Sequence, residues 1–224
     1  MAEKQNFYLD LVVCLDISKN MGNQIDFISD FLNRFYDVAK TEVQNSVTKV
    51  QQVRIKIITF SDYNQEEPLC DYGFLNMPDQ SVELFQLLES LPIVPEFKQE
   101  GLSNGLEALC LAMDSEFVDL SNANGRQSVV VFSTNKPFNF EDSQGEESYP
   151  SNFPKTLMEL KNKWEKNKVL DKNKKMLTLF CNLDKGKNSW YPLEKWDKVM
   201  AIHTDDINEY TNDFILETIL IDII

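Results

Sequence analysis

The chain is poor in the residues that most often carry metal clusters and phosphate-binding loops. It has one histidine and seven glycines, and neither G-x-x-x-x-G-K-[ST] nor G-x-G-x-x-G occurs. A metal cluster built on several histidines is therefore excluded, and no glycine-rich loop indicates nucleotide binding. The four cysteines form no C-x-x-C pair, so they are expected to be small buried side chains rather than zinc or redox ligands.

Sequence signals for a membrane or for secretion are also missing. No apolar run approaches the roughly 20 residues that span a bilayer, and the polar residues 1–6 lack the apolar core of a signal peptide. No asparagine stands in an N-x-S/T acceptor site. These absences predict a cytoplasmic protein that does not contact a membrane.

Positive charge is scarce, since 22 Lys and Arg residues face 36 Asp and Glu residues and the formal net charge is −14. The average surface therefore repels phosphate backbones, and nucleic acid is not an expected partner. With 224 residues, the chain is long enough for one sizeable core. We expect a single domain over residues 1–224.

Hydrophobic patterning predicts an α/β fold. Apolar runs without alternation are typical of strands that are covered on both faces. Strands are expected at 8–15, 53–60, 69–75, 128–133, 176–181 and 199–202. Helices are expected at 23–40, 81–88, 103–117, 154–168 and 207–224. This order predicts a mostly parallel sheet with helices on both faces.

Polar residues follow two of the long strands and open one helix. Asp16, Ser18 and Asn20 come directly after the first strand, Ser103 precedes a helix, and Thr134 follows the strand at 128–133. If the first and third long strands are neighbours, these loops meet at one edge of the sheet, where open α/β folds bind ligands. Carboxylate, hydroxyl and amide oxygens are ligands that hard cations prefer.

These residues resemble the metal-ion-dependent adhesion site of von Willebrand factor type A (vWA) domains. That family has D-x-S-x-S after its first strand, a threonine in a second loop, and an aspartate in T-D-G after a later strand. Asp16 and Ser18 match the first two positions of the motif, and Asn20 stands at its final serine. Ser103 takes the place of the threonine, and Thr134 takes that of the aspartate.

The resemblance implies a vWA/Rossmann-like fold. The expected architecture is a doubly wound, mostly parallel six-stranded sheet with one antiparallel edge strand and helices on both faces. Among the branches of the family, the chain looks closest to stand-alone cytosolic bacterial domains, including those associated with tellurite resistance.

The resemblance also implies a function and a metal. The expected function is non-enzymatic protein–protein interaction, in which an acidic side chain of the partner completes the coordination of Mg²⁺. The expected ligands are Asp16, Ser18, Asn20, Ser103 and Thr134. Because Asp16 is the one carboxylate among them, we expect either weak Mg²⁺ binding or a degenerate site held together by side-chain hydrogen bonds.

Other interpretations stay open at this point. The polar residues are also good turn and cap residues, which need no metal. A strand that ends in D-x-S is also similar to Mg²⁺-dependent phosphatases and phosphotransferases of the haloacid dehalogenase type, with Asp16 as nucleophile. Those enzymes usually carry a second acid where this chain has Ser18. A third alternative is a structural or assembly protein with a dead metal site, suggested by the apolar residues at 215–224.

Overall fold

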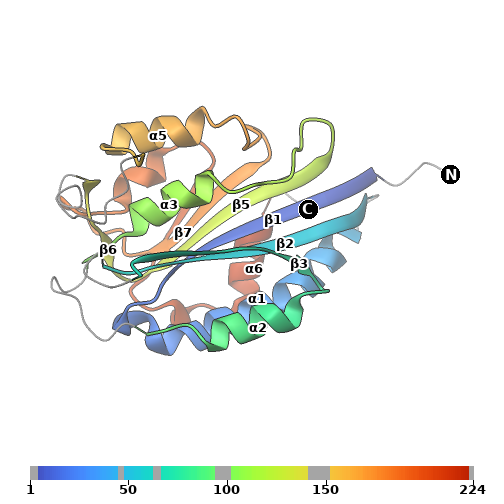
Figure 1. Ribbon diagram of the computed structural model, residues 1–224, viewed down its shortest axis with the longest axis horizontal. Helices are drawn as coiled ribbons and strands as arrows, with labels where there is room; N and C mark the ends of the chain where they lie inside the picture. The colour runs from blue at the N-terminus through green and yellow to red at the C-terminus, as the bar shows by residue number, and fades with distance from the viewer. Residues whose placement is uncertain (1–4, 45–47, 63–66, 94–101, 141–151, 222–224) are drawn as a thin grey trace.

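The computed structural model has a central sheet with helices on both faces, as Figure 1 shows. The structure describes residues 5–44, 48–62, 67–93, 102–140 and 152–221. The strands are β1 (Gln5–Asp16), β2 (Thr48–Phe60), β3 (Leu69–Met77), β4 (Leu102–Ser103), β5 (Asn124–Ser133), β6 (Lys136–Pro137), β7 (Lys175–Cys181) and β8 (Val199–His203). The α-helices are α1 (Gly22–Gln44), α2 (Ser81–Glu89), α3 (Gly105–Met113), α5 (Leu157–Glu165) and α6 (Asn212–Leu220). Short 3-10 helices are η1 (Lys19–Met21), η2 (Tyr191–Lys195) and η3 (Ile207–Glu209).

The main sheet has six strands in the order β3-β2-β1-β5-β7-β8. The neighbouring strands β2, β1, β5, β7 and β8 are parallel to one another. Strand β3, at the edge, pairs with β2 in the antiparallel direction. A separate parallel pair, β4 with β6, lies outside this sheet. The carboxyl ends of β1 and β5 are therefore side by side at one edge.

The structure is α/β with a mixed sheet, and the prediction of a doubly wound, Rossmann-like layout is wrong. In a doubly wound sheet, helical crossovers join successive parallel strands. Here no helix among the described residues separates β2 from β3, and β3 turns back antiparallel along β2. A register shift interrupts the pairing of these two strands between Lys56 and Ile58.

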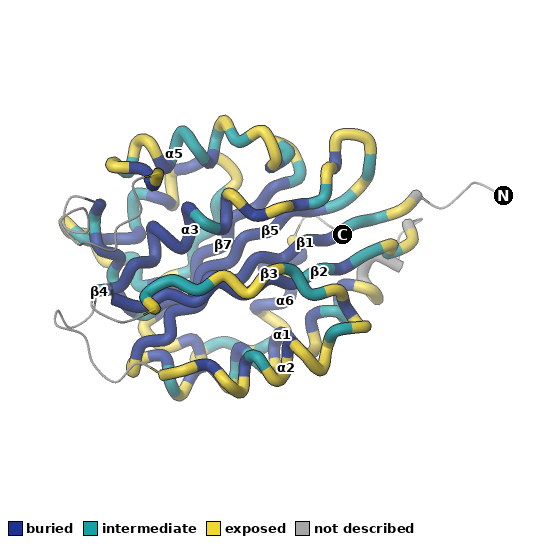
Figure 2. The backbone as a smooth tube through the Cα atoms, in the orientation of Figure 1, coloured by how far each residue is buried: buried dark blue, intermediate teal, exposed yellow. Residues whose placement is uncertain are grey.

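Strand β1 divides the hydrophobic core into two layers, because successive side chains of a strand point to opposite faces. Leu11 and Val13 pack in the cluster that includes α1, α2 and α6. Val12 and Cys14 pack in the cluster that includes α3 and α5. Figure 2 shows the resulting band of buried backbone through β1, β5 and β7. Burial on both faces explains why these strands read as continuous apolar runs.

All five predicted helices have different bounds in the structure, and the helix expected over 154–168 is limited to Leu157–Glu165. Two of the five differ for reasons that the structure shows. The helix expected from residue 103 begins at Gly105, because the preceding residues pair with β6 as strand β4. The helix expected over 207–224 is divided into η3 and α6, and Thr211 caps α6 by accepting a hydrogen bond from Phe214 N at 3.1 Å. Between the strand expected at 128–133 and the helix expected at 154–168, residues 141–151 lie outside the described part of the chain.

The apolar C-terminal segment belongs largely to the core. Ile215, Leu216, Ile219 and Leu220 are buried in the cluster that contains α1. Residues 222–224 lie outside the described part. Within the described ranges, no helix combines the length and the apolar character needed to cross a bilayer.

Three of the four cysteines are predicted to be unreactive in the native protein. Cys14, Cys110 and Cys181 are buried, and burial raises the pKa of all three thiols, that of Cys110 to about 11. Cys70 on β3 is partly exposed. We expect DTNB to react with Cys70 alone in native buffer and with all four thiols after denaturation. Rapid reaction of a second native thiol would contradict this burial.

Candidate functional site

The carboxylate of Asp16 is completely buried at the carboxyl end of β1. Its Oδ1 accepts a hydrogen bond from Ser18 N at 2.9 Å, and its Oδ2 accepts one from Ser133 Oγ at 2.7 Å. Burial raises the pKa of this carboxyl above its ordinary value of 3.8, although the hydrogen bonds from Ser133 and Ser18 oppose that change. The surrounding donors thus replace the hydration that the carboxylate loses on folding.

The side chain of Asn135 connects the loop after β1 to the loop after β5. Its Nδ2 donates to Asp16 Oδ2 at 3.0 Å and to Ser18 Oγ at 2.7 Å. Its Oδ1 accepts a hydrogen bond from Asn20 Nδ2 at 3.1 Å. One amide group therefore binds all three residues that were predicted from the first loop.

Trp190 fixes the backbone of Asn135. The Trp190 ring is fully buried, and its Nε1 donates to Asn135 O at 2.9 Å. The ring also lies against Gly105 at the start of α3, where an added Cβ would come within 2.3 Å of Trp190 Cη2. The site therefore depends on close packing between α3 and the segment that precedes η2.

Thr134, which was predicted as a ligand, lies outside the hydrogen bonds around Asp16. Its Oγ1 donates to Met21 Sδ at 3.6 Å. Asn135, the next residue, reaches Asp16 instead, and the sequence prediction did not include it. The sequence carried no signal that separates Asn135 from Thr134, because both residues are polar and both follow β5.

Ser103 is held near the segment after β5 through the backbone. Its carbonyl oxygen accepts a hydrogen bond from Phe138 N at 2.9 Å, and β4 pairs with β6. Among the described residues, no group forms a hydrogen bond with its buried Oγ or with the side-chain amide of Asn104. Asn104, rather than Ser103, is the N-cap residue of α3.

The structure brings together three of the five predicted ligands. Asp16 contacts Ser18 directly, and the Asn135 amide joins Asn20 to both. The described contacts link neither Ser103 nor Thr134 to these three.

The hydrogen-bond donors decide how a divalent cation would fit. Mg²⁺ needs oxygen lone pairs that point toward it. Both oxygens of Asp16 and the Oγ of Ser18 instead accept hydrogen bonds, and the Nδ2 of Asn135 lies between Asp16 Oδ2 and Ser18 Oγ. A cation at that position would meet the amide protons. In this arrangement the residues do not fit Mg²⁺, and the described residues include no group of three or more His, Cys, Asp or Glu side chains that could hold a metal ion.

The raised pKa of Asp16 predicts a pH dependence of stability. Between 3.8 and the higher folded-state pKa, the folded chain binds more protons than the unfolded chain, so the stability contributed by this group falls as the pH rises. We expect Asp16→Asn to flatten this part of the curve of unfolding free energy against pH, measured by urea titration. Asp79→Asn, at an exposed position, is the matched control and should keep the wild-type slope. Parallel curves for wild type and Asp16→Asn would contradict the prediction.

Comparisons with known proteins identify a similar fold and no family. No family model matches the sequence, and no curated protein matches it. One similar solved structure is the pilus adhesin SpaC from Lactobacillus rhamnosus GG, with a TM-score of 0.54 and 9% identity over 97% of this chain and 30% of that chain. Another is proximal thread matrix protein 1 from the mussel byssus, with a TM-score of 0.53 and 12% identity over 98% of this chain and 49% of that chain. This chain thus spans half or less of each protein, and at these identities the likeness concerns the fold alone.

Proposed function

We propose that this chain is a non-enzymatic protein–protein interaction module of the vWA type, and that its partner binds at the loops after β1 and β5. The observation that carries the proposal is the amide of Asn135, which binds Asp16, Ser18 and Asn20. These bonds hold the two loops together before any partner arrives. A preformed surface loses less conformational entropy on binding than a mobile one, so this arrangement favours recognition.

The chemistry of this face supports a partner that offers an acidic side chain. Lys19, Asn20 and Asn23 are exposed on the segment that follows β1, and Thr134, in the loop after β5, is half-buried in contact with Met21 of that segment. Ammonium and amide groups donate hydrogen bonds to a carboxylate. The net charge of −14 repels a broadly acidic protein, so we propose a partner with an isolated carboxylate on a neutral or basic surface.

The burial of Asp16 also supports a non-enzymatic role over the phosphatase alternative. An aspartyl nucleophile must reach its substrate, whereas this carboxylate is fully buried and both of its oxygens accept hydrogen bonds. The test is incubation with p-nitrophenyl phosphate and Mg²⁺. Sustained turnover that disappears in Asp16→Asn would favour the enzyme instead.

Partner capture with matched variants tests the interaction module. Lys19→Glu reverses a charge on the proposed face, and Lys168→Glu makes the same change at an exposed position after α5. We expect quantitative mass spectrometry to find a protein that wild type and Lys168→Glu retain from a lysate and that Lys19→Glu loses. Identical sets of retained proteins for all three chains would contradict the proposed face.

The sequence left two alternatives open, weak Mg²⁺ binding and a degenerate site held by side-chain hydrogen bonds, and the hydrogen bonds of Asn135 favour the second. Since a ligand that binds the folded state raises the melting temperature, wild type should melt at the same temperature in EDTA and in millimolar Mg²⁺. A rise that Asp16→Ala abolishes would show instead that the cation displaces the amide.

A further inference from the structure

An acidic surface with an exposed aromatic ring lies over η3 and α6. Residues 204–221 contain five Asp or Glu side chains and no Lys or Arg. Phe214 is 39% exposed, and its ring stacks on that of Tyr210 with 5.0 Å between the ring centroids. Glu209 and Glu217 are exposed, and among the described residues no side chain pairs with their carboxylates. These four residues are called the acidic surface below.

Two arginines that reach α6 are held by other groups. Arg34 of α1 forms an ion pair with Asp213 at 2.8 Å. Arg126 of β5 donates a hydrogen bond to the backbone oxygen of Ile221 at 2.7 Å. The carboxylates of the acidic surface therefore remain as an excess of negative charge around an exposed aromatic ring.

A lysine-rich segment connects α5 to β7. Residues 161–175 contain seven lysines and two acids. Both acids form ion pairs within the segment, Glu165 with Lys161 and Asp171 with Lys174. Three acids from neighbouring segments also lie beside these lysines, namely Asp114, Asp119 and Asp197. Seven lysines still exceed five acids, so this part of the chain keeps an excess of positive charge although the whole chain has a net charge of −14.

The exposed part of this segment has an apolar residue at its centre. Val169 is 49% exposed, and the exposed Lys168 and Lys172 flank it along the chain. Asn167 Oδ1 accepts a hydrogen bond from Val169 N at 2.8 Å, and Gln127 Nε2 donates one to Val169 O at 3.2 Å. These bonds hold the turn in place, which lowers the entropy lost when it binds. Lys168, Val169 and Lys172 are called the basic surface below.

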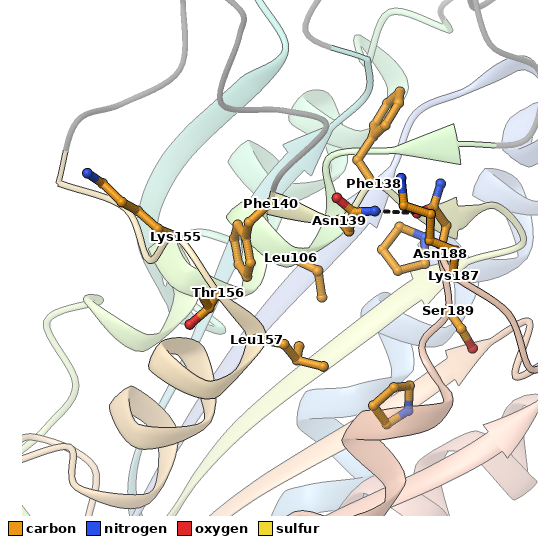
Figure 3. A pocket seen from close by; sticks show the side chains of 12 residues that line it. Leu106, Phe138, Asn139, Phe140, Lys155, Thr156, Leu157, Lys187, Asn188 and Ser189 are labelled. Atoms are coloured by element: carbon orange, nitrogen blue, oxygen red, sulfur yellow. Dashed lines mark hydrogen bonds between the residues drawn. The ribbon is translucent and has the colours of Figure 1, made fainter.

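The two surfaces lie on opposite faces of the sheet, because α6 packs in one core cluster and α5 in the other (Figure 1). A pocket of about 290 Å³ opens at the start of α5, beside Thr156 and Leu157 (Figure 3). The basic surface begins beyond the other end of that helix. The acidic and basic surfaces therefore include neither this pocket nor the loops after β1 and β5.

We propose that the acidic surface of one copy of this chain binds the basic surface of a second copy. Phe214 packs on Val169 of the next copy, and the two glutamates of the acidic surface pair with the two lysines of the basic surface. Each contact leaves one surface of either kind unused, so the copies form a head-to-tail series. This contact uses no residue of the face proposed for the partner protein, so either proposal can fail without the other.

The net charge of −14 makes this contact weak and selects its orientation. Two copies repel each other in most orientations, and attraction needs the two surfaces to face each other. At about 0.1 M salt the Debye length is about 10 Å, so the repulsion between distant acids is screened while close ion pairs persist. We therefore expect association that depends on concentration.

Sedimentation velocity of the full chain in about 0.1 M salt tests the proposal. From roughly 10 µM to 1 mM, where weak contacts become populated, the sedimentation coefficient of wild type should rise with concentration. The charge reversals Glu209→Lys/Glu217→Lys and Lys168→Glu/Lys172→Glu should each weaken this association by about tenfold or more. All four residues are exposed, so these changes leave the core intact.

Restored complementarity separates a specific contact from a general charge effect. The two variants mixed in equal amounts, or the four changes in one chain, should associate again because opposite charges face each other. Glu83→Lys/Glu89→Lys makes the same charge change around the exposed Phe85 of α2, and this control should associate at least as strongly as wild type.

Three results would each overturn the proposal: a wild-type coefficient that does not rise with concentration, no recovery in the mixture, or an equal loss of association in the α2 control. If wild type stays monomeric but binds oligolysine through Glu209 and Glu217, a foreign basic protein is the occupant and the proposed self-association is wrong.

Discussion

Asn135→Asp is expected to lower the unfolding free energy of the metal-free protein by about 3–5 kcal/mol at neutral pH. The amide nitrogen that donates to Asp16 Oδ2 at 3.0 Å would become a carboxylate oxygen. Two buried carboxylates at that distance repel each other, and each has lost its hydration. At roughly 2–4 °C per kcal/mol for a chain of this size, the melting temperature should fall by about 10 °C.

The same variant should acquire a cation site. It would offer two carboxylates and the Oγ of Ser18, with no amide protons between them, and millimolar Mg²⁺ or Ca²⁺ should restore much of the lost melting temperature. The measurement is thermal unfolding in EDTA and in added cation. Asn23→Asp, which adds the same charge at an exposed position near the site, is the control and should change little in either buffer. If Asn135→Asp melts like wild type in EDTA, the amide does not hold the site together.

Gly105→Ala is expected to destabilise the protein by about 3 kcal/mol, the upper end of ordinary overpacking. The new Cβ would lie 2.3 Å from Cη2 and 2.4 Å from Cζ2 of Trp190, and Phe60 Cε2 would be 3.2 Å away. Trp190 is fully buried, so its ring must shift, which strains the hydrogen bond from its Nε1 to Asn135 O. Chemical denaturation measures the loss directly.

A double-mutant cycle distinguishes this mechanism from a general effect of alanine on the helix. Trp190→Phe removes Cη2 and Cζ2 together with the hydrogen bond to Asn135, at a cost of about 3 kcal/mol. Because the smaller ring leaves room for the Cβ, Gly105→Ala/Trp190→Phe should be more stable by about 1–3 kcal/mol than the sum of the single effects predicts. Additive effects would show that the clash with Trp190 is not the cause.

The predicted site shows where sequence reasoning succeeded and where it failed. The position of Asp16 at the end of a buried strand followed from the apolar run before it, and Asp16 does end β1. The sequence could not show which of two neighbouring residues after β5 reaches Asp16, because Thr134 and Asn135 are both polar. Only the backbone direction after Ser133 decides that Asn135 meets Asp16 and that Thr134 meets Met21.

The layout of the sheet shows a related limit. Continuous apolar runs predicted buried strands, and the strands exist because such runs can be covered on both faces. The direction of each strand depends on the chain between strands. The return of β3 along β2 makes the sheet mixed. The expectation of one antiparallel edge strand came from the vWA resemblance, because the sequence pattern of β3 by itself is compatible with either direction.

Local chemistry in the sequence determined which segments are buried strands and that one carboxylate ends the first of them. Hydrophobic periodicity and charge are local properties, so one sequence is enough to read them. Tertiary structure alone decided that the Asn135 amide lies among Asp16, Ser18 and Asn20, since residues more than a hundred positions apart meet only through the pairing of β1 with β5. The same pairing places an amide nitrogen, a hydrogen-bond donor, where the sequence motif predicted a cation.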